Sequence, residues 1–366
     1  MKIFHITNEL SEGGVGTFLL ALLPMLKKAG NKVELLVLGE ANSALVSDMS
    51  SQGITVHVGK YASIYDPRNI FLINSYIKQG NYDIVHAHLF PTQYLVSIAK
   101  MITKNNAKFI TTEHGSYNKR RNRAILRPIE KMMYRRYDAI VGCSNDSSTN
   151  LKKWLACKRT KITTIANGIN LQIAKTAIGY TKQELNLPDD AKILIMVARF
   201  FEAKDHKTVV KAVPFLEQNV HVLFCGSGEE GVKECQLLAQ KLEVEERVHF
   251  LGNRKDISRL LKSSDVAVLS SFNEGMPLSL IEYMAAGLPS ICTDVCGSQE
   301  LAQNYGILFP VGDYECLARE VNKLLENKEY YNEVAQKCYN RAQDFSQETM
   351  MKNYTNLYKQ LLCKKN

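Results

Sequence analysis

The sequence predicts an α/β protein built from two doubly wound parallel sheets, each in its own domain. Short apolar runs, of the kind that buried parallel strands need, alternate with helical segments along most of the chain. This alternation stops over a polar stretch near residues 170–190 and then restarts. A chain of 366 residues also exceeds one ordinary hydrophobic core. We therefore expect one domain over residues 1–170 and a second over residues 171–345.

The composition is that of a soluble globular protein, with 45% hydrophobic and 23% charged residues. The N-terminus runs straight into a strand and no apolar stretch is long enough to span a bilayer, so we expect a cytoplasmic protein. Nine cysteines without a Cys-x-x-Cys motif argue against a disulfide framework or a zinc ribbon. Cys292 and Cys296 are expected to be buried free thiols. The net charge of +9 indicates an anionic partner.

The first half begins with a strand, a glycine-containing loop and a helix that runs to about Lys28. Gly14 and Gly16 in this loop allow the backbone to approach a ligand closely, and the helix N-terminus attracts anions. The loop departs from the dinucleotide fingerprint Gly-x-Gly-x-x-Gly because Leu19 stands at its last position. A dehydrogenase with Glu40 on the ribose is therefore not favoured. Strands in this half are predicted at 2–7, 33–38, 54–58, 84–86, 109–111 and 139–142.

Histidines stand at the ends of two of these strands. His86 and His88 form a His-x-His pair, but no further metal ligands lie nearby in the sequence, so we expect no metal site. His114 ends the next strand and precedes Gly115. The carboxyl ends of strands line the ligand crevice of an open α/β sheet, so His114 is a candidate site residue. Structural packing is the alternative for its side chain.

The most basic segment of the chain lies between Lys119 and Arg136. Ile125, Ile129 and Met132 stand at helical spacing within it, which predicts an amphipathic helix with a cationic side. Two interpretations stay open, namely docking on anionic lipid headgroups and a solvated face of a core helix. A nucleic acid is not expected as a partner, because the sequence contains no visible recognition module.

The second half places two cations directly beyond a buried strand. A last strand of the first half is predicted from Ile162 and ends in an Asn-Gly turn at Asn167, and a polar connection then runs to Asp190. Arg199 and Lys204 follow the first strand of the second half. They suit a diphosphate leaving group, because Arg binds phosphate oxygens bidentately and Lys acts as a point charge. The predicted strands of this half are 192–197, 220–225, 248–251, 266–269 and 290–293.

Two glutamates eight positions apart flank the start of a predicted helix over residues 280–286. Glu274 lies in the loop before the helix and Glu282 in its first turn, and Gly287 is expected to end the helix in the left-handed conformation. Two carboxylates at this place suit a polyhydroxyl ligand, since each accepts several hydrogen bonds. A capping box, in which Ser279 caps the helix and Glu282 reaches back to it, is the alternative.

Taken in order, these motifs resemble those of retaining glycosyltransferases of family GT4, and the resemblance spans nearly the whole chain. Its most specific part is Glu274, seven residues and Glu282, on a helix leading into Ala-Ala-Gly-Leu-Pro. The resemblance implies a GT-B fold, with two Rossmann-like domains facing a central cleft. It also implies that the C-terminal helix, residues 346–366, crosses back to the first domain. The implied activity is transfer of a sugar from a nucleoside diphosphate, with UDP expected, to an acceptor hydroxyl.

The resemblance also assigns roles to residues. Glu274 would contact the donor sugar, Glu282 the ribose, and His114 both the donor sugar and the acceptor. His114, Glu274, Arg199 and Lys204 form the implied catalytic set. The implied donor-binding residues are Gly14, Gly16, Arg199, Lys204, Asn253, Glu274, Gly275, Met276, Pro277, Leu278 and Glu282. Residues 295–300 resemble the family's glycine-rich turn.

Cofactor and partners follow from the same resemblance. The chain contains no Asp-x-Asp motif, so a metal-clamped diphosphate is unsupported and no metal or other cofactor is expected. The implied acceptor is a glycan, expected to be lipid-linked and used in exopolysaccharide or capsule synthesis at the inner face of the cell membrane. A nucleotide-sugar 2-epimerase of the same fold and a non-catalytic scaffold docked on the membrane are the alternatives.

Overall fold

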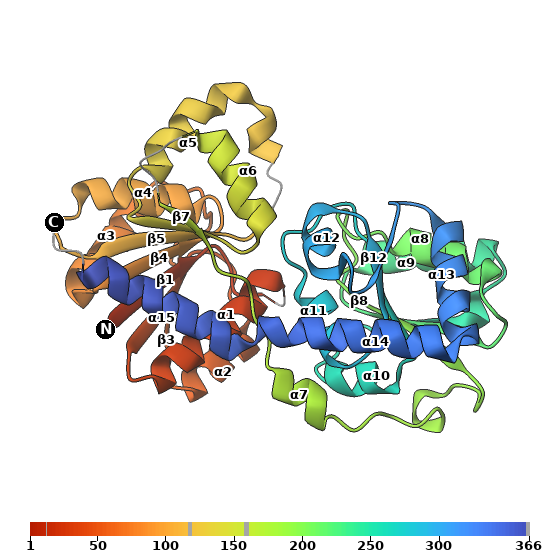
Figure 1. Ribbon diagram of the computed structural model, residues 1–366. Helices are drawn as coiled ribbons and strands as arrows, with labels where there is room; N and C mark the ends of the chain where they lie inside the picture. Colours follow the sequence, from red (N-terminus) through yellow and green to blue (C-terminus); the bar gives the residue numbers. More distant parts are fainter. Residues whose placement is uncertain (12, 116–118, 157–160, 364–366) are drawn as a thin grey trace. The chain divides into compact units, whose positions relative to one another are not determined.

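The computed structural model describes residues 1–11, 13–115, 119–156 and 161–363, and these form two α/β units (Figure 1). The first unit comprises Met1–Gly168 together with Gln347–Asn366. The second unit comprises Ile169–Ser346. From the sequence, the domain boundaries were predicted between residues 170 and 171 and between residues 345 and 346. None of the described helices combines the length and apolar character that crossing a bilayer requires.

The first unit contains a seven-stranded parallel sheet in the order β3-β2-β1-β4-β5-β6-β7. Its strands are apolar on both faces because helices cover both sides of the sheet. The strands are β1 (Lys2–Thr7), β2 (Lys32–Val37), β3 (Thr55–Val58), β4 (Ile84–His88), β5 (Lys108–Glu113), β6 (Ala139–Gly142) and β7 (Ile162–Thr164). The main helices between them are α1 (Gly14–Lys28), α2 (Ser43–Ser51), α3 (Arg68–Gly80), α4 (Thr92–Ile102), α5 (Arg127–Tyr134) and α6 (Asn145–Leu155).

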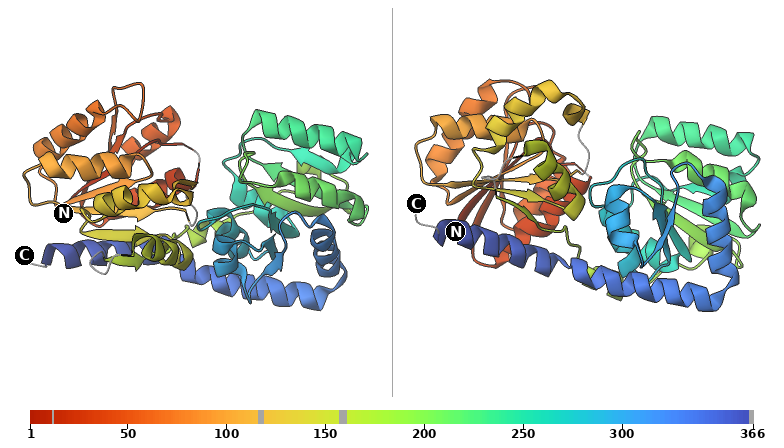
Figure 2. Two further views of the ribbon diagram at one scale, coloured as in Figure 1. Left: turned by 90° about the horizontal axis from the view of Figure 1, so that it is seen from above. Right: turned by 45° about the horizontal axis from the view of Figure 1, so that its top comes forward.

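The C-terminal helix α15 (Gln347–Cys363) belongs to the core of the first unit (Figures 1 and 2). Its buried Tyr354, Leu357 and Tyr358 lie in one hydrophobic cluster with Phe18 and Leu22 of α1. A second cluster, on the other face of the sheet, gathers side chains of α3, α4 and α6. The end of the chain therefore completes a core that its beginning started.

The basic segment is not the single amphipathic helix that was predicted. It forms two short 3-10 helices, η1 (Lys119–Asn122) and η2 (Ala124–Leu126), followed by α5. Pro128 stands in the first turn of α5, and a proline inside a longer helix would clash with the carbonyl of the residue four positions earlier. The proline therefore starts a new helix at this point.

The second unit contains a six-stranded parallel sheet in the order β10-β9-β8-β11-β12-β13. Its strands are β8 (Lys192–Val197), β9 (Val220–Cys225), β10 (Val248–Phe250), β11 (Val266–Leu269), β12 (Ser290–Thr293) and β13 (Ile307–Phe309). Its α-helices are α7 (Leu171–Thr176), α8 (His206–Ala212), α9 (Glu229–Lys241), α10 (Ile257–Ser263), α11 (Leu278–Ala285), α12 (Cys296–Ala302), α13 (Tyr314–Glu326) and α14 (Lys328–Ala342). The connection to Asp190 thus contains α7, which was not predicted.

Helix α11 ends as predicted, with Gly287 in the left-handed conformation at φ +83°. The Leu288 amide donates to the Tyr283 carbonyl at 3.2 Å and the Gly287 amide donates to the Met284 carbonyl at 3.0 Å. These two bonds are the Schellman arrangement, which satisfies carbonyls that a helix end leaves without partners.

Residues 296–302 form helix α12, where a glycine-rich turn was predicted over 295–300. Gly297 allows α12 to pack closely against the loop before α11, because a Cβ at this position would lie 2.4 Å from the Gly275 carbonyl oxygen. Cys292 is buried as predicted, but Cys296 is exposed. Helix α12 buries Gly297, Ser298 and Leu301, and this orientation turns the first residue of the helix toward solvent.

Candidate active site

The second unit brings Lys204 and Glu274 together at the carboxyl ends of β8 and β11. Glu274 is 8% exposed, and its Oε1 accepts hydrogen bonds from the Lys204 ammonium and from Ser271 Oγ, the latter at 2.6 Å. An antiparallel bridge between Lys204 and Ser271 joins the two loops that carry these residues. The arrangement places an ammonium and a carboxylate side by side in a nearly buried position.

Arg199 is exposed at the end of β8 and lies over the ring of Phe201, with 5.2 Å between the guanidinium carbon and the ring centroid. Within the described residues no carboxylate pairs with Arg199. Its five donors can therefore serve an anionic ligand.

The loops after β9 and β10 pack against the loop that follows β8. Gly228 adopts φ +129°, and a Cβ there would lie 2.3 Å from the carbonyl oxygen of Phe200. The Gly226 amide donates to the Gly252 carbonyl at 2.8 Å, and Asn253 follows directly. Predicted donor-site residues thus lie on loops of the second unit that contact one another.

The capping box predicted at α11 does not form. Pro277 occupies the N-cap position, and no side chain caps the helix. Ser279 is already inside the first turn of the helix. Among the described residues the Glu282 carboxyl group has no hydrogen-bond or ion-pair partner, and burial raises its pKa to about 7. Glu282 therefore does not take part in a capping box, which was the alternative to a role in ligand binding.

In the first unit His114 directly follows β5 and is partly buried. Its ring meets the edge of Phe18 of α1, with 4.9 Å between centroids, and its Nε2 lies 3.1 Å from His88 Nδ1. Burial lowers the pKa of His114 to about 3, so its imidazole is neutral at physiological pH.

The two glycines of the predicted phosphate loop differ in what they contact. Both lie in the first turn of α1. A Cβ on Gly14 would meet nothing within 4 Å, whereas a Cβ on Gly16 would lie 1.9 Å from the Ser11 carbonyl oxygen. The chain's own packing therefore accounts for Gly16, and the prediction that it allows close approach of a ligand is not needed to explain it.

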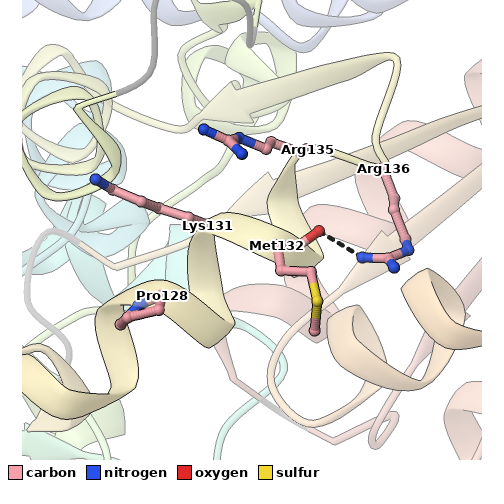
Figure 3. A pocket seen from close by; sticks show the side chains of 5 residues that line it. All are labelled: Pro128, Lys131, Met132, Arg135 and Arg136. Carbon is pink, nitrogen blue, oxygen red and sulfur yellow. Dashed lines mark hydrogen bonds between the residues drawn. The ribbon is translucent and has the colours of Figure 1, made fainter.

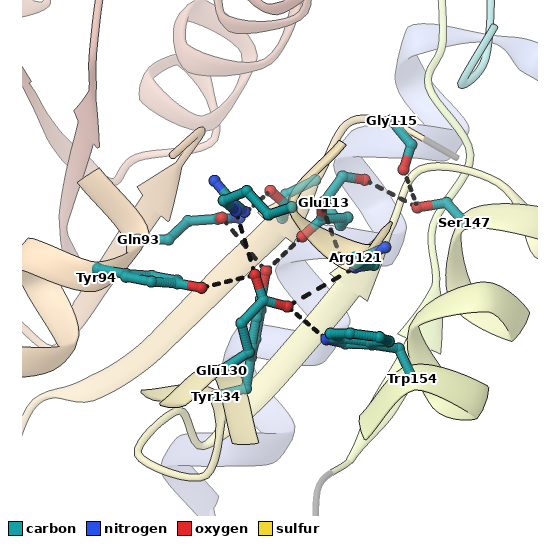
Figure 4. A network of polar contacts seen from close by, with 11 residues as sticks. Gln93, Tyr94, Glu113, Gly115, Arg121, Glu130, Tyr134, Ser147 and Trp154 are labelled. Carbon is teal, nitrogen blue, oxygen red and sulfur yellow. Dashed lines mark hydrogen bonds and ion pairs between the residues drawn. The ribbon is translucent and has the colours of Figure 1, made fainter. Parts of the chain in front are cut away.

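The backbone on both sides of His114 is held by residues that the sequence analysis missed (Figure 4). Ser147 Oγ lies 3.3 Å from the Glu113 carbonyl oxygen and 3.1 Å from the Gly115 carbonyl oxygen. The Glu113 carboxylate accepts a hydrogen bond from Tyr134 at 2.7 Å and pairs with Arg121 at 3.1 Å. No local sequence signal marks these contacts, because they join β5, η1, α5 and α6.

Arg120 and Arg121 point into the protein rather than into solvent. Arg120 Nε donates to the fully buried Glu130 at 3.2 Å. The Glu130 carboxylate also accepts from Trp154 Nε1 and from the Tyr94 hydroxyl at 2.6 Å each (Figure 4). These two arginines belong to the buried network and are not part of a cationic surface, which corrects the prediction for this part of the basic segment.

A cluster of three buried histidines has ligand atoms close enough to be considered for a metal. The atoms of His5, His86 and His88 lie within 4.8 Å of one another. His86 bonds to the hydroxyls of Tyr358 and Thr112, at 2.8 Å each, and His5 bonds to His88 at 3.0 Å. These contacts describe a hydrogen-bonded cluster and leave one ring nitrogen, His5 Nε2, without a partner among the described residues.

Comparison with known proteins matches each unit to a glycosyltransferase family model. The family model described as Glycosyltransferase Family 4 matches residues 12–173, and the model described as Glycosyl transferases group 1 matches residues 180–344. The chain is 28% identical to N-acetyl-alpha-D-glucosaminyl L-malate synthase of Bacillus anthracis over 84% of its own length and 83% of the relative. It is 26% identical to the UDP-Gal:alpha-D-GlcNAc-diphosphoundecaprenol alpha-1,3-galactosyltransferase of Escherichia coli, covering 76% and 75% of the two chains.

Solved structures agree on the fold. A glycosyltransferase from Rickettsia africae aligns with a TM-score of 0.86 at 21% identity, covering 99% of both chains. Anabaena HepE, solved with UDP and glucose, aligns with a TM-score of 0.86 at 18% identity, covering 98% of this chain and all of that one. Both are of the GT-B type, with two Rossmann-like units.

Proposed function

The chain belongs to glycosyltransferase family 4, and from this premise we propose that it moves a sugar from UDP to a hydroxyl of a lipid-linked glycan, with retention at the anomeric carbon. The observation that carries the proposal is the Lys204–Glu274 pair on loops adjoining the exposed Arg199. It combines a carboxylate for sugar hydroxyls with cations for a diphosphate. The UDP-Gal donor and the diphosphoundecaprenol-linked acceptor of the E. coli relative, together with the UDP bound to HepE, support UDP and a lipid-linked acceptor.

In the proposed reaction, each of these residues stabilises the charge on the leaving phosphate or binds hydroxyl groups of the donor. Breaking the bond between the anomeric carbon and the diphosphate oxygen leaves negative charge on the phosphate. Arg199 and Lys204 stabilise that charge, and no metal is required for this. Glu274 accepts hydrogen bonds from the sugar hydroxyls and Glu282 from the ribose hydroxyls. The acceptor oxygen bonds to the anomeric carbon on the same face that the diphosphate leaves, and the departing phosphate takes the proton of the acceptor hydroxyl, so retention needs no covalent enzyme intermediate.

The test is a panel of nucleoside diphosphates and their sugars, measured by thermal stabilisation and by transfer to a polyprenyl-diphosphate glycan in the presence of chelator. We expect UDP to raise the melting temperature and UDP-sugar to be consumed. Arg199→Ala should lose both effects, with turnover falling about 100-fold. Arg319→Ala, which removes another exposed arginine, from α13, should change neither.

Three outcomes would count against the proposal. Near-normal turnover in Arg199→Ala would remove the assigned role of this cation. Conversion of the donor without any acceptor would favour the nucleotide-sugar 2-epimerase, which shares the fold. Loss of activity in chelator, with recovery on adding a divalent metal, would overturn the proposal that the diphosphate is stabilised without a metal ion.

The surface of α5 and η2 favours docking on a bilayer. Ile125, Ile129 and Met132 are exposed by 82%, 46% and 47%. Beside them a hollow of about 530 Å³ is lined by Pro128, Lys131, Met132, Arg135 and Arg136 (Figure 3). Apolar side chains beside cations suit an interface with anionic headgroups, where each exposed Lys or Arg adds about 1 kcal/mol. We propose that this face holds the enzyme at the membrane that carries its acceptor.

Vesicle flotation tests this docking. The wild type should float with phosphatidylglycerol vesicles at low salt, less so at high salt, and not with phosphatidylcholine vesicles. Reversing two charges with Lys131→Glu and Arg135→Glu should abolish flotation. The matched double reversal Lys233→Glu and Lys241→Glu on α9, which carries exposed lysines, should retain it. Equal flotation of both double variants would refute the assigned face.

A further inference from the structure

Four histidines gather at the carboxyl ends of three neighbouring strands of the first unit. His5 lies on β1, His86 and His88 lie on β4, and His114 follows β5; these strands are adjacent in the sheet (Figure 1). His5, His86 and His88 are wholly buried. Burying so many polar rings is costly unless their nitrogens are hydrogen-bonded, so their contacts need an explanation.

Three of these rings form a chain of hydrogen bonds that ends at His114. His5 Nδ1 lies 3.0 Å from His88 Nε2, and His88 Nδ1 lies 3.1 Å from His114 Nε2. His86 stands outside this chain, since its two nitrogens bond to Tyr358 and Thr112. At the far end, His5 Nε2 is buried and has no hydrogen-bond partner among the described residues.

The rings in the chain are neutral at physiological pH. Burial lowers the pKa of His5 and of His114 to about 3, and it lowers the pKa of His88 well below its usual range. A neutral imidazole carries one N–H and one acceptor nitrogen. The proton of each ring therefore decides the direction in which the next hydrogen bond runs.

Only two directions are consistent along the chain. In the first, His5 donates from Nδ1 to His88, His88 donates from Nδ1 to His114, and the His114 proton stands on Nδ1. In the second, every bond is reversed, His114 donates from Nε2, and the proton of His5 stands on the unpartnered Nε2. Orphaned buried N–H groups are rarer in proteins than acceptors with an unused lone pair, which favours the first direction.

We propose that His5 and His88 are positioning residues, which hold His114 with its proton on Nδ1 so that this nitrogen donates a hydrogen bond to an oxygen of the donor sugar. The inference rests on the proposed function, because it takes His114 as a residue of the sugar site. Edge contact with Phe18 further fixes the His114 ring. The ligand class is an oxygen with a free lone pair, such as a sugar hydroxyl.

The first measurement reads the protons directly in the full-length protein. Long-range nitrogen–proton NMR spectra of histidine-labelled enzyme distinguish the two neutral tautomers. We expect His5, His88 and His114 all to carry their proton on Nδ1. A proton on His114 Nε2 would overturn the proposal. This readout needs no substrate, so it stands even if sugar transfer itself is not found.

The second measurement compares two substitutions at the far end of the chain. His5→Phe keeps an aromatic ring but removes the donor, so His114 should show a mixture of tautomers, and kcat/KM for transfer should fall about tenfold. His5→Asn places an amide N–H near the position of Nδ1 and should restore both. UDP binding should be equal in all variants. Unchanged tautomers and unchanged kcat/KM in a folded His5→Phe would refute the relay.

His86→Asn provides the matched control for burial. It disturbs a ring that is equally buried but lies outside the chain, so it should lower the melting temperature without moving the His114 proton. A shift of the His114 tautomer in this variant would show that general loosening of the core, rather than the chain, sets the proton. An enzyme with the expected tautomers but no transfer would instead contradict the proposed function alone.

Discussion

At the scale of single residues, the ion pair between Lys204 and Glu274 affects both the stability of the protein and its proposed activity. Both side chains were predicted as ligand contacts from their places after strands. Their contact with each other was not predicted, because it joins residues 70 positions apart through a bridge between two loops. A nearly buried carboxylate without its cation is strongly destabilising, while removing both charges together costs far less.

This pairing predicts different outcomes for stability and turnover. Lys204→Met should lower the free energy of unfolding by about 3 kcal/mol, because Glu274 keeps its charge without a partner, and should cut turnover about 100-fold. Adding Glu274→Gln should recover most of the stability and none of the turnover. Urea unfolding and transfer assays on the single and double variants measure both. Recovered turnover in the double variant would mean that Lys204 serves only to neutralise Glu274.

Glu282 should make stability depend on pH. Its pKa in the folded protein is about 7, above the ordinary 4.5, so the folded state holds the proton more tightly than the unfolded state. Stability is therefore lost as pH rises from 4.5 through 7. Because the group is partly exposed, Glu282→Gln should be more stable than the wild type at pH 8 by about 2 kcal/mol, with no gain near pH 4.5. Melting curves of Glu282→Gln and of the wild type at the two pH values measure this difference. An equal gain in stability at both pH values would contradict the raised pKa of Glu282.

At the scale of elements, sequence patterns predicted the strands of both sheets well and the helices less well. Strands such as Val220–Cys225 are short, wholly buried and apolar, so composition alone marks them. The three-residue β13 is too short to give a pattern, and α13 and α14 were not predicted. The basic segment was misjudged because helical spacing of its apolar residues does not reveal that Arg120 and Arg121 bind buried carboxylates.

The end of α11 offers a test at this scale. Gly287 adopts φ +83° with open space around it, so a substitution there meets backbone strain and no clash. Gly287→Ala should cost about 1 kcal/mol of stability, and Gly287→Asn should cost less because Asn tolerates the left-handed region. Urea unfolding of both variants measures the difference. Equal costs would mean that something other than backbone strain governs this helix end.

At the scale of the whole molecule, α15 makes the first unit discontinuous in sequence. Tyr354 is fully buried in the core that α15 shares with α1, and its hydroxyl bonds to Thr112 at 3.2 Å. Tyr354→Ala should destabilise the first unit by about 4 kcal/mol. Leu324→Ala in α13 should instead destabilise the second unit. Calorimetry combined with hydrogen exchange should show that the two variants lose stability in different units. A single unfolding transition, shifted equally by both substitutions, would contradict independent unfolding of the two units.

The position of α15 also bears on how the protein is made. Residues 169–346 leave the ribosome before the last helix exists, so the second unit can complete its core while the first still lacks part of its own. At about 5–20 residues per second, translating this chain takes on the order of half a minute, and the unfinished first unit must wait for about half of that time. The amino-terminal half, although synthesised first, is thus finished only once α15 has been made, and a chain cut short before α15 lacks a closed first core.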